Sequence, residues 1–176
     1  TDMSNLRLIN ETTGSNVSSV SLTDVFSADF DIYKIEQTDY TPLSATSQSV
    51  MRLINASGSV ISTSDYEYGS LFQPSYSSFV FDKSTSSTFI MDGLGNDQND
   101  TVGGGAVYYL FNPFSSTQYT FGIGQLSNFN TGSGMYARKD IGVLKSTASM
   151  TGIQFISTGS ANITTNIRVF GLREDT

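Results

Sequence analysis

Short β-prone runs separated by turn-forming residues constrain this chain more than any other feature of its sequence. The last run is the clearest, because Ile163, Thr165, Ile167, Val169 and Gly171 alternate with other residues and therefore share one face of a strand. Helical periodicity is hard to find, and even the best window, residues 21–35, is full of Ser, Thr and Asp, which compete with the helical backbone. The sequence therefore predicts strands and no substantial helix.

Similar runs occur along the whole chain. Residues 50–63 and 79–91 each contain two β-prone runs around a polar segment, which predicts two hairpins. Residues 107–111 are continuously apolar, so we expect this strand to be buried on both faces. About ten or eleven short strands at this spacing predict an all-β fold, an antiparallel β-sandwich. With 176 residues, we expect an N-terminal arm or edge strand over 1–10 and a single domain over 11–176.

The composition excludes several kinds of chemistry. The chain has no His and no Cys, which removes histidine-based triads, zinc and Fe–S sites and disulfides. The net charge is −7 and the nine basic residues are scattered, so no nucleic-acid stripe or anionic membrane partner is expected. No apolar run approaches a membrane span, and no leader is expected. We predict no cofactor.

Charged residues make up only 14% of the chain, against about 25% in typical soluble domains. Protein interfaces are likewise depleted of charge at their centres, and half-buried Tyr suits them because its ring is apolar and its hydroxyl polar. We therefore name an apolar cluster in the arm and a set of tyrosines as candidate partner-binding residues. They are Leu6, Leu8, Ile9, Tyr66, Tyr68, Tyr108, Tyr109 and Tyr119.

The one long irregular stretch, residues 92–105, is a candidate ion-binding loop. Five of its side chains carry oxygen atoms of the kind that calcium binds: Asp92, Asn96, Asp97, Asn99 and Asp100. Their spacing does not match an EF-hand, so we favour a solvated loop and keep calcium as the alternative. The Gly-rich segments at 103–105 and 122–124 lack the lysine and helix of a phosphate cradle and predict turns.

Two pairs of carboxylates are close enough along the chain to be weighed as glycosidase acids. Asp29 with Asp31, and Asp65 with Glu67, would share a strand face about 7 Å apart. Ordinary solvent-facing strand polarity explains them equally well, and the chain has no Trp to form a sugar platform. We therefore predict no catalytic residues.

Three stretches resemble small structural proteins of tailed bacteriophages, especially marine and cyanobacterial ones. They are SSVSLTDVFSADFDIYKIEQT at 18–38, MRLINASGSVISTSDYEY at 51–68, and SMTGIQFISTGSANITTNIRVFGLRED at 149–175, whose closing strand with Gly171 is the most specific. The resemblance implies a jelly-roll-like β-sandwich that associates as a homotrimer. Members of this family serve as head decoration (cement) proteins or as domains of tail fibres, and the resemblance carries over no catalytic residue.

The resulting expectation is a capsid decoration protein on the outer surface of a virion head, assembled in the host cytoplasm. It would bind the major capsid protein or another virion protein and stabilise the shell by mass action. The alternative is a tail-fibre or head-fibre adsorption module that binds host glycan or protein through residues 92–105 and 128–134. A glycan-degrading enzyme that uses the carboxylates named above is a third possibility.

Overall fold

The computed structural model describes residues 5–42, 48–93, 103–130, 132–159 and 162–173, which form eleven β-strands and no helix. The strands are β1 (Leu6–Val17), β2 (Ser19–Leu22), β3 (Ile32–Pro42), β4 (Ser49–Asn55), β5 (Tyr66–Pro74), β6 (Val80–Ser87), β7 (Gly104–Phe111), β8 (Thr120–Asn130), β9 (Gly134–Leu144), β10 (Met150–Ser157) and β11 (Ile163–Leu172). The prediction of an all-β antiparallel sandwich is confirmed. Among the described residues, no helix is long and apolar enough to span a membrane.

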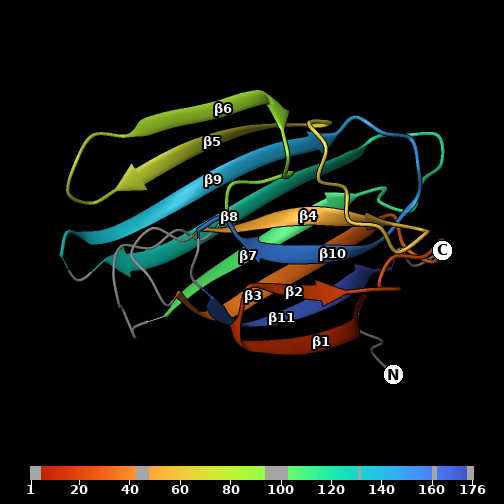
Figure 1. Cartoon of the computed structure of the whole chain (residues 1–176), viewed down its shortest axis with the longest axis horizontal. Coiled ribbons are helices and arrows are strands. Elements are labelled where there is room, and N and C mark those ends of the chain that lie inside the picture. Colours follow the sequence, from red (N-terminus) through yellow and green to blue (C-terminus); the bar gives the residue numbers. More distant parts are fainter. Residues whose placement is uncertain (1–4, 43–47, 94–102, 131, 160–161, 174–176) are drawn as a thin grey trace.

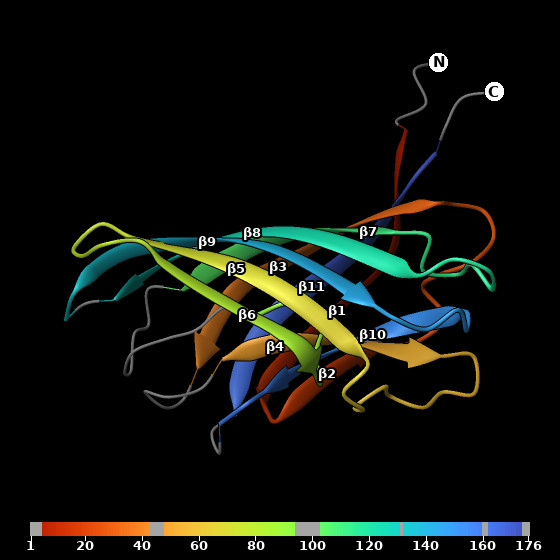
Figure 2. The ribbon, with the colours of Figure 1, turned by 90° about the horizontal axis from the view of Figure 1, so that it is seen from above.

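The strands form two antiparallel sheets of unequal size (Figure 1). The large sheet has the order β1-β11-β3-β7-β8-β9-β5-β6, and the small sheet has the order β2-β10-β4. Figure 2 shows the small sheet on one side of the large sheet, under its middle and one end. We call the side of the large sheet that faces the small sheet the inner face, and the opposite side the outer face.

The core fills the space between the two sheets. Burial alternates residue by residue along β8 and β11, so the predicted inward face of the last strand is confirmed. Tyr33, Tyr66, Tyr108 and Phe155 are among the largest fully buried side chains. Buried tyrosines keep a partner for the hydroxyl group: that of Tyr66 donates to the carbonyl of Ile61 at 3.0 Å. Burial raises the pKa of Tyr66 to about 12.

A crossing segment, residues 88–93, covers part of the inner face that the small sheet does not reach. Ile90 and Met91 at its centre are fully buried. Glycines of the large sheet leave the space for it, since a Cβ on Gly142 would overlap the Ile90 carbonyl oxygen and one on Gly122 would overlap the Met91 side chain. The backbone of this segment therefore lies directly against β9, and the Met91 side chain lies against β8.

Three local predictions are corrected. Residues 80–87 form one continuous strand, β6, and not two arms of a hairpin, because an exposed edge strand tolerates their polar side chains. In residues 50–63 the return arm is reduced to a single bridge between Ile54 and Val60. The expected loop at 128–134 is a short connection, since β8 runs to Asn130 and β9 begins at Gly134.

Candidate protein-binding face

The burial of strand β7 differs from the prediction for residues 107–111, and the difference indicates a candidate site. Its apolar residues were expected to be buried on both faces, but only Tyr108 and Leu110 are buried. Val107, Tyr109 and Phe111 are half-buried on the outer face, because no second described layer covers them. Apolar side chains thus lie on a sheet face that is open to solvent.

The cross-strand register aligns such side chains into two adjacent rows across most of the large sheet. Residues directly opposite each other on paired strands share a face and lie close together. We call these two rows the apolar band: the first contains Leu6, Leu172, Ile32, Phe111, Phe121 and Val143, and the second contains Leu8, Phe170, Tyr109, Ile123 and Ile141. Lys34 on β3 interrupts the second row between Phe170 and Tyr109.

The apolar band is most exposed on β1, β8 and β9. The exposed fraction is 50% for Leu8, 52% for Phe121, 46% for Ile123 and 63% for Ile141. These four side chains alone present on the order of 400 Å² to solvent, which is as large as the biggest apolar patch of a typical monomer. The half-buried members of the band add to this area, so the whole patch is larger than a soluble monomer ordinarily leaves open.

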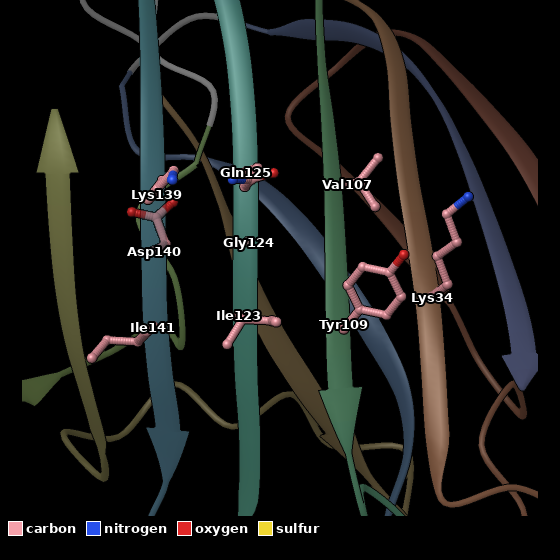
Figure 3. A pocket seen from close by; sticks show the side chains of 9 residues that line it. All are labelled: Lys34, Val107, Tyr109, Ile123, Gly124, Gln125, Lys139, Asp140 and Ile141. Atoms are coloured by element: carbon pink, nitrogen blue, oxygen red, sulfur yellow. The ribbon is translucent and has the colours of Figure 1, made fainter. Parts of the chain in front are cut away.

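The centre of the band is hollowed. An open hollow of about 610 Å³ is lined by Val107, Tyr109, Ile123 and Ile141, with Lys34 on the β3 side (Figure 3). Figure 3 shows these side chains spread over four neighbouring strands, β3, β7, β8 and β9. The walls are apolar and the rim is polar, which is the arrangement of a binding surface that takes up an apolar side chain of a partner.

A row of polar and charged residues runs beside the band. Glu36 on β3 belongs to this row, and its Oε1 lies 2.7 Å from Nζ of Lys34 in the second row of the band. The same Nζ lies 5.7 Å from the centre of the Phe170 ring. Glu11 accepts hydrogen bonds from Asn166 and Arg168, which lower its pKa. Lys139 is exposed, and it makes no ion pair within the described part of the chain. Lys139 is therefore a cation beside the apolar centre that a partner could pair with.

The candidate residues in the arm and on β7 lie partly in this face. Leu6 and Leu8 belong to β1, which forms one edge of the large sheet, and both lie in the apolar band with Tyr109. Ile9 is partly buried and packs against the core. Tyr119 is exposed just before β8 begins.

Two other tyrosines are corrected as partner contacts, and a third, Tyr68, lies away from the apolar band. Tyr66 and Tyr108 are fully buried, because alternation points their rings to the inner face. Tyr68 also lies on the inner face, where its ring stacks on Phe89 at 5.1 Å and its hydroxyl donates to Asp82 at 2.9 Å. These three side chains stabilise the fold.

The calcium candidates fall mostly outside the described residues, where Asn96, Asp97, Asn99 and Asp100 lie. Asp92 is buried, and its carboxylate forms an ion pair with Arg138. Within the described ranges, no group of three or more acidic side chains could hold a metal ion. Asp92 is therefore explained by its contact with Arg138.

A second buried acid lies near this ion pair. Asp140 is 2% exposed, and neither carboxylate oxygen has a hydrogen-bond partner among the described residues. Burial raises its pKa to about 6, and the nearby Ser70 and Arg138 offset only part of this effect. The carboxyl group lies on the inner face. It belongs to no group of three or more acidic side chains that could hold a metal ion in the described part of the chain.

Two of the four weighed carboxylates have a partner among the described side chains. Asp29 and Asp31 are exposed before β3 begins. Glu67 is paired with Lys145 at 2.9 Å, while Asp65 accepts a hydrogen bond from Thr63. Each of the last two carboxylates thus has a structural partner.

Sequence reasoning missed most of the band, including Phe121, Ile123 and Ile141. Their alternation with glycines could have revealed them in the sequence. Gly122, Gly124 and Gly142 occupy the opposite face of the strand, so the large side chains of residues 121–124 and 141–142 all lie on one face. No protein-family model, curated protein or solved structure matches the chain, so its own geometry carries the functional argument.

Proposed function

We propose that this chain is a non-enzymatic structural protein that works by docking its apolar band against another protein surface. The band itself is the observation that supports the proposal, because it places two adjacent rows of apolar side chains on a solvent-facing sheet. Exposed apolar patches of this size, rimmed by polar residues, mark interaction sites. The low charge of the chain fits the same role.

Binding explains the polar side chains better than catalysis does. Asp92 and Glu67 are engaged by Arg138 and Lys145, and the chain has neither His nor Cys to serve as a base or a nucleophile. We infer that the protein stabilises an assembly and transforms no substrate.

More specifically, we propose that the chain is a capsid decoration protein on the outside of a phage head. The resemblance of residues 18–38, 51–68 and 149–175 to phage structural proteins supports this form, whereas the apolar band supports the protein contact in general. The assembly that it joins would be the shell of the major capsid protein. Because it would bind only the assembled shell, it would shift the equilibrium toward that shell.

An adsorption module is the second candidate, and one observation favours it. Phe129 and Met135 are exposed at the end of the β8–β9 pair, beside an open hollow of about 430 Å³. Asp39 and Gly103 also line this hollow, so it offers both polar and apolar contacts. A host glycan or protein is the ligand that such a module would take.

Quantitative mass spectrometry of separated heads and tails of the source particle tests the proposal. We expect the protein in heads, at a copy number near that of the shell protein. A few copies confined to tails would overturn decoration and support adsorption. The shell protein and a tail protein, measured in the same fractions, control for cross-contamination.

A further inference from the structure

The outer face of the large sheet is complementary to itself. We propose that two copies of this chain pack outer face to outer face, about a two-fold axis that runs between β7 and β8 and nearly parallel to them. This deepens the proposed function by naming the partner of the apolar band. It rests on the band being a protein contact, and it does not rest on the capsid assignment.

The strand order decides which strands meet in such a pair. Four strands lie on each side of the proposed axis, β1, β11, β3 and β7 on one side and β8, β9, β5 and β6 on the other. The two-fold operation therefore lays β7 over β8 of the second copy, β3 over β9, and β11 over β5. Two sheets packed in this way form an aligned sandwich, in which strand directions differ by about 30°.

The apolar residues face one another in this arrangement. The register of the rows places Tyr109 opposite Ile123 of the second copy and Phe111 opposite Phe121 of the second copy. Phe170 comes opposite Gly69, on the strand pair β11 and β5. A Cβ on Gly69 would meet no atom closer than 3.5 Å, so the surface there is open enough to receive a phenyl ring. The interface thus combines contacts between large apolar side chains with one in which a ring fills an open position. The same operation places Lys34 opposite Ile141 of the second copy and Leu172 opposite Glu67 of the second copy, so the stems of the two charged side chains would pack against the apolar ones.

The charges are complementary as well. In the row beside the band, Glu36 on β3 comes opposite Lys139 on β9 of the second copy, and symmetry repeats the pair. Within one copy Lys139 has no ion-pair partner among the described residues, so the second copy would supply one. Both residues border a second open hollow of about 630 Å³ on the outer face. An isologous dimer requires self-complementarity of this kind.

The area is sufficient for a stable dimer. Eight strands at about 4.8 Å and three rows of side chains at about 6.8 Å cover roughly 750 Å² on each copy. A standard protein interface buries about 800 Å² per partner. A second copy therefore fits the size of this face, its central apolar pairs and the Glu36–Lys139 charge pair together.

The oligomeric state of the purified chain tests the inference. Size-exclusion chromatography with light scattering, across the micromolar range, should give twice the chain mass of 19.0 kDa. Ile141→Lys should give a monomer with an unchanged circular dichroism spectrum. Val80→Lys is the matched control, because Val80 is also apolar and 53% exposed but lies on the inner side of β6, and it should remain a dimer.

A charge exchange provides the second readout. Lys139→Glu and Glu36→Lys should each raise the dimer dissociation constant at least tenfold, and the double variant should recover most of that loss. A monomeric wild type, a trimer, or a dimer that Ile141→Lys leaves intact would overturn the inference. If the protein is a monomer but is found in heads at the copy number of the shell protein, the dimer is overturned and the decoration function stands. If it is a dimer but is confined to tails, the decoration function is overturned and the dimer stands.

Discussion

At the scale of single residues, the buried Asp140 is the most costly polar group of the inner face. Its carboxylate is desolvated and lacks a hydrogen-bond donor within the described chain, so the charged form is disfavoured. The folded protein therefore holds a proton on this group up to a pKa of about 6, above the usual value of 3.8.

This raised pKa predicts a pH dependence of stability. Because the folded state binds the proton more tightly, the free energy of unfolding should fall as the pH rises from about 4 to about 6. Asp140→Asn should remove the contribution of Asp140 to this slope and should stabilise the protein at pH 7 by up to about 3 kcal/mol. Urea unfolding of both proteins across this pH range measures the difference.

An exposed acid provides the control for this experiment. Asp29→Asn changes the net charge by the same amount but lies at the surface, so its stability profile should stay parallel to that of the wild type. A profile of Asp140→Asn that is also parallel to the wild type would show that burial of Asp140 costs nothing.

At the scale of elements, the crossing segment 88–93 fits against the glycines of β8 and β9. The small sheet has three strands, and this segment adds to its cover of the inner face with Ile90 and Met91. Its place depends on the absence of side chains at Gly122 and Gly142. Two sheets of unequal size are thereby packed around one core.

Gly142→Ala should therefore destabilise the fold. The new methyl group would overlap backbone of the crossing segment, and overpacking of this kind costs about 1–3 kcal/mol. Gly105→Ala is the control, since the nearest atom to its Cβ would be 3.7 Å away. Denaturant unfolding of both variants measures the effect, and equal stabilities would contradict this close packing.

At the scale of the whole molecule, the two ends of the chain are joined in one sheet. β11 lies between β1 and β3, and its pairing with β1 joins residues more than 140 positions apart. β1 is an edge strand, whereas β11 has a neighbour on both sides and contributes Ile163, Ile167 and Val169 to the core. Removal of one end should therefore affect the fold far more than removal of the other.

Two truncations test this asymmetry. Deletion of residues 163–176 should abolish cooperative unfolding, because β1 and β3 lose their shared partner. Deletion of residues 1–10 should keep the transition, because it removes only part of an edge strand. Circular dichroism during thermal unfolding checks both. A cooperative transition in the first truncation would mean that β11 is dispensable.

Much of the fold could be predicted from the alternation of side chains. The last strand was predicted with its correct inward residues, from Ile163 to Gly171, because period-two alternation records which face is buried. The hairpin predicted for residues 79–91 was wrong, because its polar middle is equally suited to a turn and to the exposed edge strand that it forms. Local sequence does not distinguish these two environments.

The candidate site was less accessible to sequence reasoning. Tyr108 and Tyr109 are adjacent and chemically identical, yet one is fully buried and the other lies in the open apolar band. Nothing in the run at 107–111 tells which face the second sheet will cover, since both faces carry apolar side chains.

By itself, the sequence determined the class of fold, the number of strands and the absence of histidine and cysteine chemistry. These depend on local periodicity and composition, which the chain carries whatever its neighbours are. Only the tertiary structure decided that eight strands form one sheet and three form the other, and hence that no second layer of described residues covers a broad apolar face. That outcome depends on pairings between distant strands, such as β1 with β11, and on the space that Gly122 and Gly142 leave for the crossing segment.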